Sequence, residues 1–107
     1  MTRSILIIFN ITYYVDKSSQ EKWYDWMISD FLPTWISEDK FVSVQICSVE
    51  IISDDCIYAI HHYCDSLVKL HSFIQDFENN MKSTHFNKFG DKIHYFATIL
   101  KQINQLN

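Results

Sequence analysis

Histidines, cysteines and tryptophans are the residues of this sequence that could carry chemistry, and two of the histidines are adjacent. His61 and His62 look like two ligands of one metal ion. Neighbouring residues of a strand point to opposite faces, so these two imidazoles cannot share an ion. A site made of His62 and His94 would need neighbouring strands, and the expected strand order places a third strand between them. The sequence therefore predicts no metal site.

His85 lies one helical turn after Met81, near the end of a long amphipathic segment. The buried stripe of that segment is expected to be Leu67, Leu70, Phe73, Ile74, Phe77 and Met81, with His85 continuing it. A protonated imidazole is favoured at a helix C-terminus, where it can bond the last carbonyls. The position thus predicts a structural histidine. The alternative is a general acid or base, which needs a reacting group within hydrogen-bond reach.

The three cysteines, Cys47, Cys56 and Cys64, are odd in number and have no C-x-x-C spacing. They predict reduced thiols in a cytoplasmic protein. Gly90 is the only glycine, which excludes a glycine-rich phosphate loop. No cofactor is expected.

Composition narrows the class of protein further. A chain of 107 residues is expected to form one domain, residues 1–107. Its 48% hydrophobic and 16% aromatic content excludes disorder and favours a buried surface beyond one small core. A net charge of −4 with nine Lys and Arg residues argues against nucleic acid as a partner. No segment approaches the roughly 20 apolar residues that span a bilayer, so no membrane partner is expected.

The pattern of apolar residues and breaks predicts six elements in the order βαββαβ. Strands are expected over residues 4–15, 41–52, 56–64 and 92–103, and helices from about residue 18 to 37 and from 65 to 89. Asp16 or Ser18 caps the first helix, Asp65 caps the second, and Gly90 ends it. A turn at Ser53-Asp54-Asp55 joins the central strands. With right-handed crossovers, this order gives a ferredoxin-like α+β fold, a four-stranded antiparallel sheet with two helices on one face.

The second face of that sheet is left without helices. The row Ile5, Ile7, Phe9 and Ile11 belongs under the helices. The open face is expected to carry Leu6, Ile8, Asn10, Thr12 and Tyr14, then Ser43, Gln45, Cys47 and Val49, then Tyr58, Ile60, His62 and Cys64, and finally His94, Phe96, Thr98 and Leu100. Apolar side chains gathered on an exposed face usually mark an interface. The sequence thus predicts a homodimer packed through the open sheet face.

Trp26 does not fit the pattern of the first helix. At 100° per residue the buried stripe is Tyr24, Met27, Ile28, Phe31 and Trp35, with Trp23 at its edge. Trp26 falls on the opposite side, and Pro33 is expected to kink the helix. Besides simple exposure of the side chain, two explanations stay open. Trp26 packs on the partner subunit or on the segment after Gln102, so that Trp26→Ala weakens the dimer more than it unfolds the monomer, or it forms a pocket wall for a flat ligand.

Two motifs carry a resemblance to a known family. The pair Trp23-x-x-Trp26 and the stretch His85-x-x-Lys88-Phe89-Gly90, together with the order of elements, resemble a family of small bacterial proteins known as a domain of unknown function. That family is placed in the dimeric α/β-barrel superfamily, and the resemblance covers essentially the whole chain. The sequence departs from it at Thr34, where a histidine or another polar residue is expected.

Two functions are consistent with these observations. The first is a homodimeric binding or regulatory module without chemistry of its own, which the absence of a clustered acid, base or nucleophile favours. The second is a small-molecule enzyme, because dimeric α/β barrels include monooxygenases and haem-degrading enzymes. By that resemblance, Asn10, Trp23, Trp26, His62 and His85 could line a pocket for a small apolar or aromatic ligand. The sequence leaves open whether the protein is an enzyme.

Overall fold

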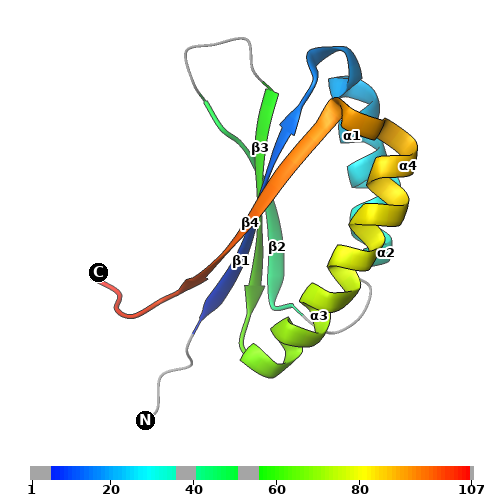
Figure 1. Ribbon diagram of the computed structural model, residues 1–107. Helices are drawn as coiled ribbons and strands as arrows, with labels where there is room; N and C mark the ends of the chain where they lie inside the picture. The colour runs from blue at the N-terminus through cyan, green and yellow to red at the C-terminus, as the bar shows by residue number, and fades with distance from the viewer. Residues whose placement is uncertain (1–5, 36–40, 51–55, 107) are drawn as a thin grey trace.

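A computed structural model describes residues 6–35, 41–50 and 56–106 (Figure 1). The strands are β1 Ile7–Val15, β2 Ser43–Ser48, β3 Cys56–Cys64 and β4 Ile93–Lys101. The first helical segment comprises a 3-10 turn, η1 Lys17–Ser19, then α1 Gln20–Trp26, the π-helical turn η2 Met27–Phe31 and α2 Leu32–Trp35. The second comprises α3 Leu67–Asn80, the π-helical turn η3 Met81–His85, α4 Phe86–Phe89 and a 3-10 turn, η4 Gly90–Lys92.

The strands form one antiparallel sheet in the order β2-β3-β1-β4. Figure 1 shows both helical segments on the same side of this sheet. The predicted ferredoxin-like fold is therefore confirmed. Strand β1 lies between β3 and β4, which keeps His62 and His94 on strands that are not neighbours.

The side chains of β1 that face the helices are the predicted ones. Ile7, Phe9 and Ile11 are buried, and the same row continues through Tyr13 and Val15. Their partners on β3 share this face, because paired residues of neighbouring strands point the same way. Ile11 pairs with Ile60, and Phe9 pairs with His62.

The predicted row of β3 is consequently wrong. The row Tyr58, Ile60, His62 and Cys64 faces the helices, and the open face carries Ile57, Ala59, His61 and Tyr63 instead. The rows predicted for the open face of β1, β2 and β4 do lie there for the paired residues of these strands, whereas Leu6 and Val49 lie outside the strands. A shift of one residue in the pairing of a strand moves all its side chains to the other face of the sheet, because side chains alternate with a period of two.

The ends of the helices are built by short polar residues and by Gly90. The side chain of Asp16 accepts a hydrogen bond from the Ser18 amide, as expected of a cap. At the second helix the cap is Ser66, whose hydroxyl accepts from the Lys69 amide at 3.3 Å, and Asp65 instead pairs with the Lys69 ammonium. Gly90 ends α4 with a φ of 61°, as predicted. The expected turn at residues 53–55 lies outside the described residues.

A π-helical turn, η2, stands where a proline kink was expected. The Leu32 amide bonds to the carbonyl of Met27, five residues back, just before Pro33. A widened turn before proline makes room for the pyrrolidine ring and absorbs its missing donor. The second π-turn, η3, lies at the matching level of the second segment and carries His85. Both turns alter which side chains face the sheet.

Candidate functional site

Aromatic rings from both helical segments and from β1 surround His85. We call this group the His85 cluster: Tyr13, Trp23, Trp26, Phe31, His85 and Phe89. The His85 ring stacks on Tyr13 with centroids 5.6 Å apart and meets Trp26 and Phe31 edge-on at 4.8 Å each. Strand β1 supplies the flat floor, and the two π-turns bring their rings together above it. The cluster joins the two helical segments to the sheet.

His85 is a neutral buried base within this cluster. Only 3% of the residue is exposed, and Trp23 donates its indole Nε1–H to His85 Nε2 at 3.4 Å. Because Nε2 accepts, the proton of the neutral ring resides on Nδ1, which has no acceptor among the described residues. Burial lowers the pKa of His85 to about 3. The predicted protonated imidazole at the helix end is therefore wrong, because the ring is packed among apolar groups instead of reaching the last carbonyls.

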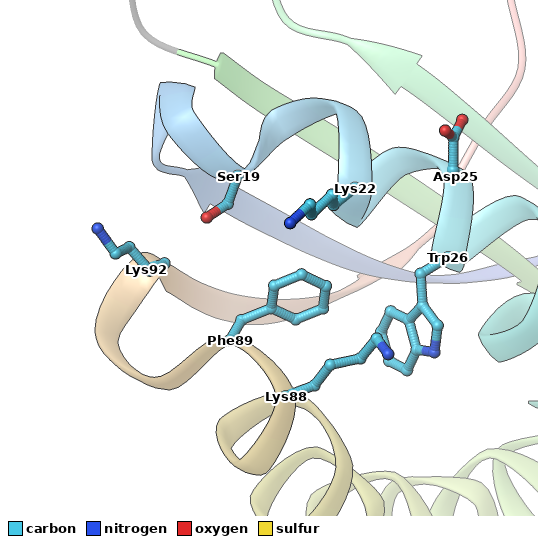
Figure 2. Close-up of a pocket in the computed structure, with 7 residues that line it drawn as sticks. All are labelled: Ser19, Lys22, Asp25, Trp26, Lys88, Phe89 and Lys92. Carbon is cyan, nitrogen blue, oxygen red and sulfur yellow. The ribbon is translucent and has the colours of Figure 1, made fainter.

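Trp26 separates two hollows beside the cluster. The larger, which we call the lysine cleft, has a volume of about 670 Å³ and is lined by Ser19, Lys22, Asp25, Trp26, Lys88, Phe89 and Lys92 (Figure 2). The smaller, the polar cavity, has a volume of about 140 Å³ and is lined by Trp26, Asp30, Phe31, Thr34, Asn80 and Thr84. Trp26 is half-buried and contributes to both walls.

The contacts of Trp26 answer the question that the sequence raised. Its ring packs on Phe31 at 5.0 Å and on Phe89 at 5.5 Å, besides the contact with His85. The ammonium of Lys88 lies 5.7 Å from the ring centroid. Residues 102–106 are exposed, so the segment after Gln102 does not cover Trp26. The tryptophan is held by the second helical segment of its own chain, and its remaining surface borders the lysine cleft.

The lysine cleft lies at the end of the fold where α1 begins and α4 ends. Figure 2 shows Lys88 extended along Trp26, and Phe89 pointing between Trp26 and Lys22. Lys92 pairs with Asp16 at 4.0 Å. Hydrogen bonds from Ser18, together with the Lys92 charge, lower the pKa of the Asp16 carboxyl. The cleft thus combines aromatic walls with a cationic rim.

The five residues predicted to line one pocket divide into three places. Trp23, Trp26 and His85 meet in the His85 cluster. His62 faces the helices elsewhere, 1% exposed, and its Nδ1 lies 3.0 Å from the carbonyl of Phe9. Burial lowers the pKa of His62 to about 4. Asn10 lies on the open sheet face, where its amide donates to Thr98 at 3.3 Å.

No pocket therefore joins Asn10 to His62 and His85 within the described residues. The lysines of the cleft were missed by the sequence reading. A signal for one of them exists: Lys22 stands four residues before Trp26, and residues at this spacing share one side of a helix. Lys88 and Lys92 have the same spacing, but the chain turns at Gly90 between them, so their convergence depends on the tertiary fold.

Metal-binding groups of three or more His, Cys, Asp or Glu residues do not occur in the described part of the chain. Cys47, Cys56 and Cys64 all lie in described strands and form no disulfide. None of the helices in the described ranges is long and apolar enough to cross a membrane.

The family model named Domain of unknown function (DUF4286) matches residues 6–103. The chain belongs to this family. The match covers every described strand and helix of the DUF4286 protein, including the lysine cleft and the His85 cluster. No curated protein matches the sequence at a significant level.

Two solved structures share the fold of the DUF4286 chain. A dimeric ferredoxin-like protein from an uncultured marine organism aligns with a TM-score of 0.75 at 9% identity, over 97% of this chain and 100% of its own. A candidate antibiotic biosynthesis monooxygenase from Bacillus cereus aligns with a TM-score of 0.59 at 10% identity, over 95% of this chain and 97% of its own. At these identities the likeness establishes the ferredoxin-like fold and nothing of the activity.

Proposed function

We propose that this DUF4286 protein is a homodimeric binding or regulatory module of the bacterial cytoplasm. Its two subunits pack through the open sheet faces, and each subunit holds a small aromatic ligand in the lysine cleft. The observation that carries the binding role is the position of Trp26, whose ring is fixed by three aromatic neighbours while it walls a cleft of about 670 Å³. A rigid indole at the edge of a hollow is a good stacking surface for a flat ligand.

The open sheet face supports the dimer. Tyr14, Phe96 and Leu100 are 43%, 48% and 47% exposed on this face, and the rings of Tyr14 and Phe96 lie 6.0 Å apart. Ile8 and Ile57 add further apolar surface. Apolar side chains gathered on one exposed face usually pack on another protein surface. The marine ferredoxin-like protein named as dimeric supports the same assembly by analogy of fold.

The overall dimensions also support a partner for the sheet. The radius of gyration is 14.8 Å, against about 13 Å for a compact chain of this length. Figure 1 shows helices on one side of the sheet and an extended segment after β4, and both enlarge the radius.

Native mass spectrometry of the protein purified from its own host tests the proposal. The expected species is a dimer with additional mass from a bound ligand. If the dimer carries no additional mass, naphthalenemethanol serves as a neutral aromatic probe. Its binding is detected by NMR through the indole N–H signals of Trp23 and Trp26. The Trp26 signal should shift while that of buried Trp23 shifts less. A monomer at low micromolar concentration contradicts the dimer, and a Trp26 signal that neither the alcohol nor its charged naphthalene analogues perturb contradicts the binding role.

A second candidate is a small-molecule enzyme of the dimeric α/β-barrel type. It is favoured by His85, whose protonated Nδ1 is a hydrogen-bond donor without an acceptor among the described residues, next to the wall of the cleft. The fold likeness to a candidate monooxygenase points the same way. Oxygen uptake with the ligand purified from the host tests this function. Uptake that His85→Gln abolishes, while ligand binding persists, would establish catalysis in place of simple binding.

A further inference from the structure

We infer that the ligand of the lysine cleft is an anion, a flat aromatic molecule that carries a carboxylate or phosphate group. This inference rests on the proposed binding function and adds the charge of the ligand. The aromatic walls provide the stacking surface, and the lysines around them provide the counter-charge.

The lysine cleft carries an excess of positive charge, whereas the protein as a whole has a net negative charge. The chain has a net charge of −4 with nine Lys and Arg residues. Three of these nine, Lys22, Lys88 and Lys92, line a single cleft, together with one carboxylate, Asp25. A local excess of positive charge on an acidic protein attracts a small anion without making the protein a general binder of polyanions.

Two of the three ammonium groups are available to a ligand. Lys92 is shared with Asp16 at 4.0 Å, which leaves Lys22 and Lys88. Neither of these two forms an ion pair with a carboxylate of the described residues. Figure 2 shows the Asp25 carboxylate directed away from Trp26 and Lys88, so it does not neutralise them. An oxyanion in the cleft would therefore find uncompensated donors.

The geometry also places the charge next to the stacking surface. Lys88 Nζ lies 5.7 Å from the centre of the Trp26 ring, and Phe89 lies beside it in the same wall. The cation–π contact of an exposed lysine is weak, so Lys88 can turn from the ring to an oxyanion. The hydroxyl of Ser19 lines the same cleft and adds a neutral donor. A ring stacked on Trp26 would carry its acidic group within reach of these donors.

A set of matched naphthalene probes tests the inference by calorimetry on the full-length protein. Naphthoate and naphthyl phosphate present one ring with two different oxyanions, naphthalenemethanol presents the ring without charge, and inorganic phosphate presents the charge without the ring. We expect at least one anionic naphthalene to bind about tenfold more tightly than the alcohol, with the advantage reduced by added salt. The tighter of the two anions identifies the carboxylate or the phosphate as the group recognised.

The variants connect the effect to the cleft. Lys22→Gln combined with Lys88→Gln should reduce the affinity for the preferred anion about tenfold and leave the alcohol unchanged. The matched control is Lys69→Gln, an exposed lysine of α3 outside the cleft, which should leave every probe unchanged. Circular dichroism confirms that these surface variants are folded.

The outcomes separate the two proposals. Equal binding of alcohol and anions, or a double lysine variant with unchanged anion affinity, overturns the anionic ligand and leaves the binding module standing. Binding of inorganic phosphate as tight as that of naphthyl phosphate overturns the role of the ring. Failure of every probe to perturb Trp26 overturns the binding function itself.

Discussion

The burial of His85 predicts that the stability of the protein depends on pH. Its pKa of about 3 and the pKa of about 4 for His62 both lie below the ordinary value of 6.5, because burial disfavours the charged rings. The unfolded chain therefore binds protons below pH 6.5 that the folded chain does not. The contribution of each neutral histidine to the free energy of unfolding is fully present above pH 6.5 and decreases as the pH falls. The decrease ends at about pH 4 for His62 and at about pH 3 for His85.

We expect the free energy of unfolding to fall by about 1.4 kcal/mol per pH unit for each of these two histidines once the pH is well below 6.5. His85→Gln should remove its share of the slope, measured by urea titration between pH 7 and about pH 4.5. His71→Gln, at an exposed position of α3, is the control and should keep the slope of the unmodified protein. A slope that persists undiminished in His85→Gln would mean that the imidazole is charged in the folded chain.

Trp26 is expected to stabilise the subunit itself. The sequence predicted that Trp26→Ala would weaken the dimer more than it unfolds the monomer. The contacts with Phe31, His85 and Phe89 within one chain reverse this expectation. Trp26→Ala should lower the free energy of unfolding by about 2 kcal/mol, less than a fully buried tryptophan would, with the dimer mass unchanged. The control is Tyr24→Ala, because Tyr24 is 41% exposed on the same helix. This variant should lose less than about half as much free energy of unfolding as Trp26→Ala.

Among the elements, the first helix was predicted in the wrong orientation, and the π-turn η2 contributes to the difference. Uniform steps of 100° placed Tyr24 and Ile28 on the buried stripe, yet they are 41% and 42% exposed. The residues buried in this segment are Trp23, Met27 and Phe31, spaced by four, and Leu32. The π-turn η2 adds a residue to one turn, so uniform steps of 100° no longer predict the facing of the residues that follow it, such as Leu32.

The second helical segment was predicted more accurately. Phe73, Phe77 and His85 follow the spacing of four and are buried, as predicted, whereas Leu67 is exposed. Strands were predictable where apolar and polar rows differ, as in β1. In β3 the two rows contain similar residues, and only pairing with β1 decides which row is buried. The lysine cleft could not be predicted, because it joins α1 to a turn more than sixty residues away.

Gly90 connects α4 to β4 and positions two of the cleft lysines. Its φ of 61° with a ψ of −133° is disfavoured for residues with a side chain, while no atom lies within 4 Å of an added Cβ. Gly90→Ala should therefore destabilise the protein by about 1–2 kcal/mol through backbone strain alone. Thermal unfolding measures the loss. Asn87→Ala, exposed in α4, should be close to neutral, and equal stability of both variants would contradict the strained backbone at position 90.

For the molecule as a whole, the decisive prediction concerns the uncovered side of the sheet. Phe96 lies in the middle of β4 on the open face, beside Tyr14, and its side chain is free of the helical layer. In a twofold-symmetric dimer, each substitution at an interface acts twice. Phe96→Glu buries two carboxylates without partners if the sheet faces meet, which is far more costly than the loss of apolar area alone.

We expect Phe96→Glu to raise the dissociation constant of the dimer by about a hundredfold or more, measured by sedimentation equilibrium across low micromolar concentrations. The folded subunit should survive, because the ring contributes no buried contact to the core. Val68→Glu introduces the same charge on α3, at a residue that is 81% exposed on the helical side, and should leave the dimer intact. An intact dimer in Phe96→Glu together with dissociation in Val68→Glu would place the interface on the helices, where a partner subunit would cover the helical layer instead of the sheet.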